Sequence, residues 1–148
     1  MITITNLTTN PVDEEYLKSI CQKVLKEEGE KEPQLSVVLV GQGRMKQLNK
    51  KYRGKNRVTD VLAFPSNRTI DFVTPPNEES ELGEIVLCMP VLKKNAKRLN
   101  STLEKELTIS LIHGILHLLG YDHEKNASAA KKMEEKQQYY LNQFIAPS

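Results

Sequence analysis

Short apolar stretches with the period of a β-strand recur along this chain. Residues 2–7 alternate apolar and polar side chains, as expected of a strand with one exposed face. Three further stretches are almost wholly apolar and short enough for buried strands, and they cover residues 35–40, 61–65 and 83–89. The polar residues and paired prolines of residues 67–82 predict a long mobile loop before the last of these strands.

Apolar residues at helical spacing occupy the segments between and after these strands. Asn10-Pro11 can cap and begin a helix that closes at Gly29, and a capping box at 101–104, Ser-Thr-Leu-Glu, begins a helix that runs to Gly120. Three other helices are expected, over a short segment with Met45, Leu48 and Tyr52, from Pro90 to Leu99, and over a final segment with Met133, Tyr140, Leu141 and Phe144. Strands that alternate with helices, without an internal repeat, predict one small layered α/β domain over residues 1–148.

The length and composition are those of an ordinary globular protein. A chain of 148 residues can bury about two thirds of its unfolded surface around one core. Hydrophobic residues make up 39% of the chain and charged residues 27%, and no apolar run approaches the roughly 18 residues of a membrane-spanning helix. The N-terminal segment lacks the basic start and apolar core of a signal peptide, so we expect a cytoplasmic protein. Cys21 and Cys88 fall in apolar segments and are expected to be buried thiols rather than a disulfide or metal ligands.

Positive charge is concentrated in one part of the sequence, although the net charge is only +2. No Asp or Glu occurs between Pro33 and Thr59. The cations of this segment are Arg44, Lys46, Lys50, Lys51, Arg53, Lys55 and Arg57. A solvated helix face and an anion-binding patch both fit this pattern. Because tryptophan is absent and aromatic residues make up 5% of the chain, charge alone allows nucleic-acid binding without establishing it.

All three histidines of the chain lie in one short stretch, HGILHLLGYDH, which spans residues 113–123. On a helix His113 and His117 share one face about 5.4 Å apart, and Gly120 allows a turn that returns the chain to the same point. Three imidazoles in an apolar shell favour a metal, zinc before nickel or copper, and leave a fourth position open for water as at a catalytic zinc. The spacing matches the zinc-protease motif H-E-x-x-H-x-x-G-x-x-H, but Gly114 stands where the protease has its catalytic glutamate.

Three sequence blocks together resemble the YbeY family of bacterial metal-dependent endoribonucleases. The histidine stretch is similar to the family's H-G-x-L-H-L-x-G-Y-D-H motif. Residues 49–65, NKKYRGKNRVTDVLAFP, resemble its N-x-x-Y/F-R-x-x-D-x-x-T-D-V-L-S-F-P block, and residues 82–88, LGEIVLC, resemble its L-G-D-I-V-I-C strand. The blocks follow the family's order and spacing, and with the element order they cover nearly the whole chain. Asn56 and Ala63 depart from the family's Asp and Ser, whereas Arg53 and the three histidines match.

The resemblance implies a fold and a set of site residues. The fold would be a three-layer α+β domain with a small mixed β-sheet flanked by helices, related to the catalytic domain of zinc proteases of the zincin and metzincin type. The resemblance also implies one zinc ion per chain on His113, His117 and His123. Arg53 and the ligand His113 are the candidate catalytic residues. From the residues alone, Arg53 is more typical of a solvated arginine in a basic run.

The implied activity is zinc-dependent, single-strand-specific endoribonuclease cleavage in rRNA processing, with maturation of the 3′ end of small-subunit 16S rRNA and ribosome quality control. The expected partners are single-stranded RNA, rRNA and the small ribosomal subunit with its associated factors, and neither DNA nor a membrane. Two other classes stay open: a ribosome assembly factor whose zinc is mainly structural, and a small zinc protease, against which Gly114 counts. Thr59 and Asp60 are expected at a turn or strand start, and Asp122 either orients a ligand histidine or is an exposed turn acid.

Overall fold

A small mixed β-sheet forms the centre of the fold in the computed structural model, which describes residues 1–66 and 81–146. The strands are β1 (Ile2–Asn6), β2 (Gln34–Val40), β3 (Val61–Pro65) and β4 (Glu81–Cys88), in the order β1-β2-β4-β3. β1, β2 and β4 are parallel, and β3 pairs antiparallel with β4. All four strands were predicted from the apolar pattern. The predicted loop at 67–82 lies outside the described residues except for its last two, which begin β4.

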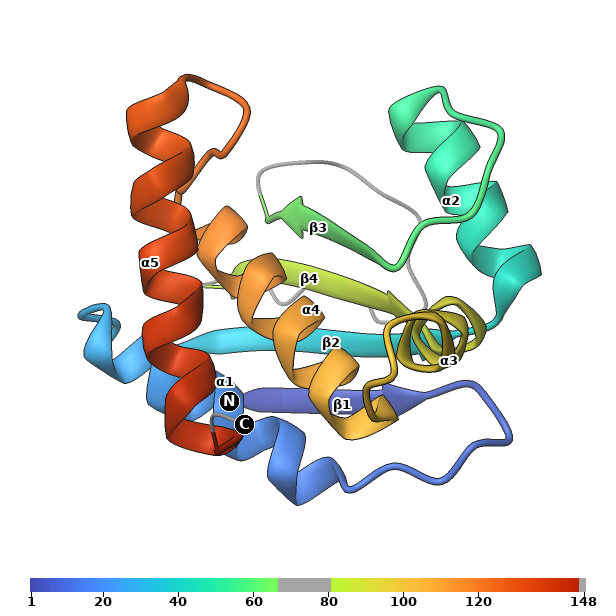
Figure 1. The fold of residues 1–148 in the computed structure, drawn as a ribbon, viewed down its shortest axis with the longest axis horizontal. Helices are drawn as coiled ribbons and strands as arrows, with labels where there is room; N and C mark the ends of the chain where they lie inside the picture. The colour runs from blue at the N-terminus through green and yellow to red at the C-terminus, as the bar shows by residue number, and fades with distance from the viewer. Residues whose placement is uncertain (67–80, 147–148) are drawn as a thin grey trace.

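Helices cover both faces of this sheet (Figure 1). The helices are α1 (Glu14–Glu27), α2 (Gln42–Arg53), α3 (Met89–Arg98), α4 (Leu103–Leu118) and α5 (Ala127–Phe144). Successive residues of β2 face opposite sides, so that Val37 and Leu39 join a large apolar cluster with α1, α4 and α5. Val38 and Val40 join a smaller cluster with Met45 and Leu48 of α2. The predicted α+β class with a small mixed sheet is therefore confirmed.

Helix α4 packs directly on the sheet because a glycine faces the strands. A Cβ atom on Gly114 would lie 3.1 Å from the Ile85 side chain and 3.4 Å from that of Val61. The helix therefore approaches β3 and β4 more closely than a larger residue would allow. This packing places His113 and His117, on either side of that glycine in sequence, beside the antiparallel strand β3.

Two predicted helix starts are displaced by local hydrogen bonds. The first helix is capped by Asp13, whose side chain accepts a hydrogen bond from the Tyr16 amide, and not by Asn10. Asn10 instead accepts, through its backbone carbonyl, a hydrogen bond from the side chain of Asn6 at the end of β1. Similarly, Thr102 rather than the adjacent serine caps α4 and accepts from the backbone amide three residues later. In each case a second good capping residue lies close to the predicted one, and its side chain makes the capping hydrogen bond.

Both cysteines are buried free thiols, as predicted. Cys21 lies on the inner face of α1 and Cys88 at the end of β4. Burial raises the pKa of the Cys21 thiol to about 12, so that it is uncharged at neutral pH. Within residues 1–66 and 81–146, no helix combines the length and the apolar composition needed to cross a bilayer.

Candidate metal centre

A cavity of about 250 Å³ lies between α4, strand β3 and the segment that joins α2 to β3. Its lining includes all four site residues predicted from the sequence, namely Arg53, His113, His117 and His123. The remaining lining residues are Asn49, Lys55, Arg57, Thr59, Asp60, Val61, Leu62, Ala63, Gly114 and Glu124. The fold thus brings Arg53 and the histidines, which are far apart in sequence, to one place.

His113 is held in position by a contact from the last helix. Its Nδ1 atom makes a hydrogen bond with Oε1 of Gln137 on α5. An amide oxygen can only accept, so Nδ1 bears the hydrogen of this bond, and in the neutral ring Nε2 is then the nitrogen with the free lone pair. This is the tautomer that a metal ligand requires, with the second nitrogen fixed by a neighbouring oxygen.

A tight turn after α4 brings the third histidine to the same cavity. Gly120 adopts a left-handed conformation with φ of 101°, and its amide donates to the carbonyl of His117. The next amide, from Tyr121, donates to Leu116. These two bonds form a Schellman motif, which reverses the chain where the sequence predicted the helix to end. As a result His123 lies with its ring centre 5.2 Å from that of His113.

The histidines fit a zinc site in part. Zinc–nitrogen bonds of about 2.0–2.1 Å in tetrahedral geometry put two ligand ring centres roughly 5 Å apart, which the His113–His123 pair matches. His113 and His117 are stacked with ring centres 6.5 Å apart. In the described residues, no three His, Cys, Asp or Glu side chains are arranged to hold an ion as they stand. His117 Nδ1 is buried without a hydrogen-bond partner, so the ring that is stacked on His113 carries an unsatisfied nitrogen.

The charge state of His117 also suits a metal ligand. Its pKa is lowered, first by burial and then by the nearby charges of His113 and Arg53, while Asp122 raises it and His123 lowers it. The ring is therefore neutral at pH 7. A neutral imidazole has a free lone pair, which is the form that binds a metal ion.

Arg53 lies at the C-terminal end of α2 and reaches across the cavity wall to β3. Its Nη2 atom donates a 3.4 Å hydrogen bond to the carbonyl of Ala63. The contact uses the backbone of Ala63, so it does not depend on the serine side chain that the YbeY pattern has at this position. Arg53 is exposed and close enough to the histidines for its charge to lower the pKa of His117. A fixed cation beside three imidazoles can bind an anionic substrate.

Comparison with known proteins agrees with the resemblance seen in the sequence. A family model described as "Endoribonuclease YbeY" matches residues 3–145. The chain belongs to this YbeY family. A protein named "Endoribonuclease YbeY" from Thermotoga maritima is 41% identical over 130 residues, which are 87% of this chain and 79% of the relative. A relative of the same name from a Sulfurihydrogenibium species is 38% identical over 126 residues, 85% of this chain and 80% of its own.

A solved structure extends the likeness to the fold. The solution structure of TM1509 from Thermotoga maritima superposes with a TM-score of 0.67 at 37% sequence identity. The match covers 97% of this chain and 89% of that one. The two proteins therefore share a fold as well as a related sequence.

Two amides shape this YbeY site although the sequence analysis assigned them no role. Asn49 is buried, and its side chain donates to the carbonyl of Arg57, which ties the segment after α2 back onto that helix. Gln137 orients His113 in the same manner from α5. Each amide lies on the apolar face of its helix, four residues after a buried methionine. Asn49 follows Met45 on α2, and Gln137 follows Met133 on α5. A polar residue inside an apolar stripe was therefore the signal available in the sequence.

The acids near the site mainly support its loops. Asp60 Oδ1 accepts from the Val61 amide at 2.9 Å, and Oδ2 accepts from Ser110 on α4 at 3.5 Å. Asp60 is thus a strand-start residue, as predicted, that also joins β3 to the histidine helix. Asp122 is exposed and accepts from the Glu124 amide, which is the turn-acid alternative. In the described structure Asp122 makes no hydrogen bond to any of the three histidine rings, although its charge raises the pKa of His117.

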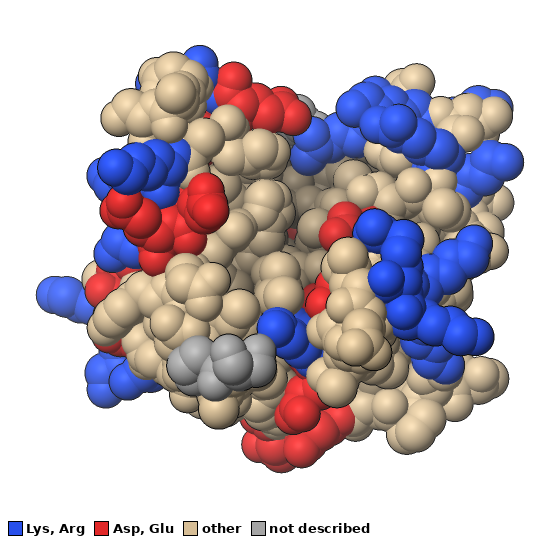
Figure 2. Space-filling model, viewed as in Figure 1, with Lys and Arg blue, Asp and Glu red and all other residues tan. Residues whose placement is uncertain are grey.

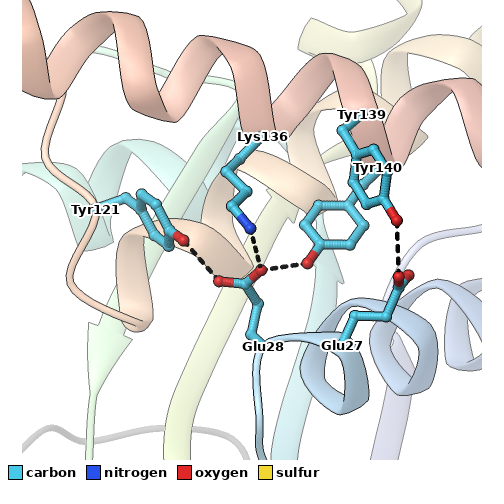
Figure 3. A network of polar contacts seen from close by, with 6 residues as sticks. All are labelled: Glu27, Glu28, Tyr121, Lys136, Tyr139 and Tyr140. Atoms are coloured by element: carbon cyan, nitrogen blue, oxygen red, sulfur yellow. Dashed lines mark hydrogen bonds and ion pairs between the residues drawn. The ribbon is translucent and has the colours of Figure 1, made fainter.

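A polar network holds the turn that carries His123 against α1 and α5 (Figure 3). The carboxylate of Glu28 accepts hydrogen bonds from the hydroxyls of Tyr121, at 2.6 Å, and Tyr140. It also pairs with Lys136 at 3.1 Å. Burial alone would raise the pKa of Glu28, but these three donors outweigh it and lower the pKa. Burial and the carboxylate raise the pKa of Tyr121 to about 12, so the tyrosine stays a donor at neutral pH.

Proposed function

We propose that this chain is a zinc-dependent, single-strand-specific endoribonuclease that acts in rRNA processing. The observation that supports the proposal most strongly is the cavity lined by three histidines and Arg53 in a member of the endoribonuclease YbeY family. Within this proposal, the cleavage matures the 3′ end of small-subunit 16S rRNA and serves ribosome quality control. The reaction takes place in the cytoplasm, with the small ribosomal subunit and its factors as partners.

The proposed chemistry divides between a metal ion and the residues of the cavity. A zinc ion on His113, His117 and His123 would polarise a phosphoryl oxygen or supply hydroxide near pH 7. Gln137 accepts from Nδ1 of His113, which leaves Nε2 of the neutral ring available for that bond. The guanidinium of Arg53 offers two parallel donors to the phosphate oxygens and neutralises the negative charge that grows as the phosphorus becomes five-coordinate.

The protease alternative lacks its general base, at a position where the helix packs tightly on the sheet. Gly114 takes the place of the protease glutamate, and a Cβ there would press against Ile85 and Val61. Cleavage of a phosphodiester depends less on such a glutamate. Nearby cations stabilise its highly negative transition state more than they stabilise the transition state of amide hydrolysis. The combination of no glutamate and an arginine beside the histidines therefore favours phosphodiester cleavage.

The decisive experiment compares zinc content and RNA cleavage in variants of the purified protein. We expect Arg53→Ala to keep its zinc and its fold but to cleave a single-stranded RNA about 10³-fold more slowly at saturating RNA, the lower range for loss of a catalytic arginine. Arg53→Lys should restore only part of the rate, since a point charge cannot reproduce the planar fork. His117→Ala should lose both zinc and cleavage.

The outcomes separate the classes left open by the sequence. Lys26→Ala, an exposed cation on α1 outside the cavity, serves as the control and should cleave at the normal rate. Normal turnover in Arg53→Ala would remove this residue from the chemistry. A protein that holds zinc but cleaves no single-stranded RNA would instead favour the assembly factor with a structural metal.

A further inference from the structure

The outer face of α3 carries a second cluster of positive charge, separate in sequence from that of α2. Between Glu84 and Glu104 the chain has no Asp or Glu. The inner face of α3 packs in the core through Met89, Leu92 and Ala96. Its outer face presents four exposed cations, Lys93, Lys94, Lys97 and Arg98. Helix α3 is therefore amphipathic with an outer face whose charge is of one sign.

Among the described residues, no carboxylate pairs with these cations, whereas carboxylates pair with other cations of the protein. On α1, Lys18 pairs with Glu15 at 3.6 Å and Lys23 with Glu27 at 3.8 Å. No described carboxylate lies within ion-pair distance of an α3 cation. The side chains that do contact this cluster are neutral amides, with Lys93 bonded to Asn10 and Arg98 to Asn95 at 3.5 Å. Within residues 1–66 and 81–146, the positive charge of α3 is therefore not neutralised by an ion pair.

The two positive clusters lie next to each other on one side of the molecule, and the first of them reaches the cavity. Helices α2 and α3 contact each other, and Tyr52 of α2 and Val91 of α3 pack against the same apolar cluster. Figure 2 shows Lys and Arg in blue in two groups on the right side of the molecule, one over α2 beside the hollow at the top of the view and one over α3 below it, with a band of tan between them. Arg53, Lys55 and Arg57 line the cavity, whereas no residue of α3 does. The α3 cations therefore extend the basic surface away from the site of cleavage.

We propose that the outer face of α3 binds the backbone of the RNA segment that flanks the one held in the cavity. This inference rests on the proposed ribonuclease function. RNA is a chain of regularly spaced anions that necessarily continues beyond a scissile phosphate, and a row of cations leading away from the cavity matches it in charge and direction. Lys93 and Lys97, like Lys94 and Arg98, are one helical turn apart, so each pair presents two charges along one line of the helix.

Equilibrium binding tests this surface independently of cleavage. The variant replaces Lys93, Lys94, Lys97 and Arg98 with Gln, and binding is measured with the metal chelated so that the RNA stays intact. Single-stranded RNAs of about six and about thirty nucleotides are compared, since nucleic-acid grooves on small domains span roughly 4–16 nucleotides. We expect the long RNA to bind about tenfold to a hundredfold more weakly, with a salt slope lower by up to about 3, because each phosphate that the variant no longer neutralises lowers the slope by about 0.7. The short RNA should change less than twofold.

A control variant with the same change in net charge makes the result specific. It replaces Lys18, Lys23, Lys26 and Lys131, which are cations of α1 and α5 away from the cavity, with Gln. Equal weakening of the long RNA by both variants, or no weakening by the α3 variant, would overturn the proposal. Thermal unfolding checks that each variant is folded. If the fourfold α3 variant is not, the double variants at Lys93 and Lys97 or at Lys94 and Arg98 replace it.

Cleavage assays then distinguish this inference from the proposed function. With metal restored, the α3 variant should raise KM for the long RNA and leave kcat unchanged. If the wild-type protein binds long RNA through α3 but cleaves none, the ribonuclease proposal fails while the RNA-binding surface stands. If the wild-type protein cleaves and the α3 variant behaves like it, only the α3 inference fails.

Discussion

Gly83 allows strand β4 to approach the backbone of β3 closely beside the cavity. It lies in β4 opposite Pro65 of β3 and adopts φ of 151°, where side chains are rarely tolerated. A Cβ atom on Gly83 would lie 2.2 Å from the carbonyl oxygen of Phe64. Backbone cannot move aside as a flexible side chain can, so we expect Gly83→Ala to lower the free energy of unfolding by at least about 2 kcal/mol.

Denaturant unfolding of Gly83→Ala measures this cost against a glycine without constraints. Gly43 lies in α2 without a positive φ, and a methyl group added at this position would have no other atom within 4 Å. Alanine also has the higher helix propensity, so Gly43→Ala should be neutral or stabilising by up to about 1 kcal/mol. If the two variants unfold at the same denaturant concentration, the close approach of β4 to Phe64 does not limit stability.

At the level of elements, the Glu28 network joins the end of α1 to α5 and to the turn that carries His123. We expect Glu28→Gln to lower the free energy of unfolding by about 1–3 kcal/mol at pH 7, because a charged acceptor of three hydrogen bonds is replaced by a neutral one. The neighbouring Glu27 bonds Tyr139 on α5 but not the turn. Glu27→Gln makes the same charge change at an exposed site and should cost less than about 1 kcal/mol.

The pH dependence of this difference follows from the lowered pKa of Glu28. A carboxyl with a lower pKa in the folded state contributes its full stability above the ordinary glutamate value of about 4.3. The contribution disappears as pH falls through the lower folded-state pKa. Urea unfolding at pH 7 and at acid pH should therefore show the wild-type protein and Glu28→Gln converging on acidification, and a constant difference would contradict the assignment.

At the scale of the whole molecule, metal binding should raise the melting temperature. An ion that binds only the folded state adds about 2.7 kcal/mol at a hundred times its Kd. For a chain of this size that corresponds to a rise in Tm of roughly 5–10 °C. We expect the rise on adding zinc at about pH 7.5, its reversal by chelation, and a smaller effect below about pH 6 because protons compete for the imidazoles.

His123→Ala tests whether the stabilisation comes from the predicted ligands. This side chain is 46% exposed, so its removal should leave the metal-free Tm within about 1 °C, as expected for a surface substitution. The zinc-dependent rise should vanish or be strongly reduced. An undiminished rise in this variant would place the ion elsewhere in the protein.

Much of the fold and of the candidate site could be predicted because the signals are local. The period of apolar residues indicated each strand and helix of the described chain, and Gly120 indicated where α4 ends. The frame of His113, His117 and His123 requires only one helix and one turn, whose geometry depends on residues close in sequence. The sequence was less informative at helix starts, where Asn10 and Asp13 are both good caps and neighbouring contacts decided between them.

Only the tertiary structure decided which distant segments meet at the cavity. The sequence by itself determined the type of each element and the spacing of its histidines, since backbone geometry and side-chain periodicity are local properties. The placement of Arg53 beside the histidines depends on β3 pairing antiparallel with β4 and on α4 packing against both strands. Gln137 reaches His113, and α3 lies beside α2, for the same reason. Such contacts depend on the order of strands in the sheet and on packing across it. Sequences with the same local pattern of helices and strands can differ in both.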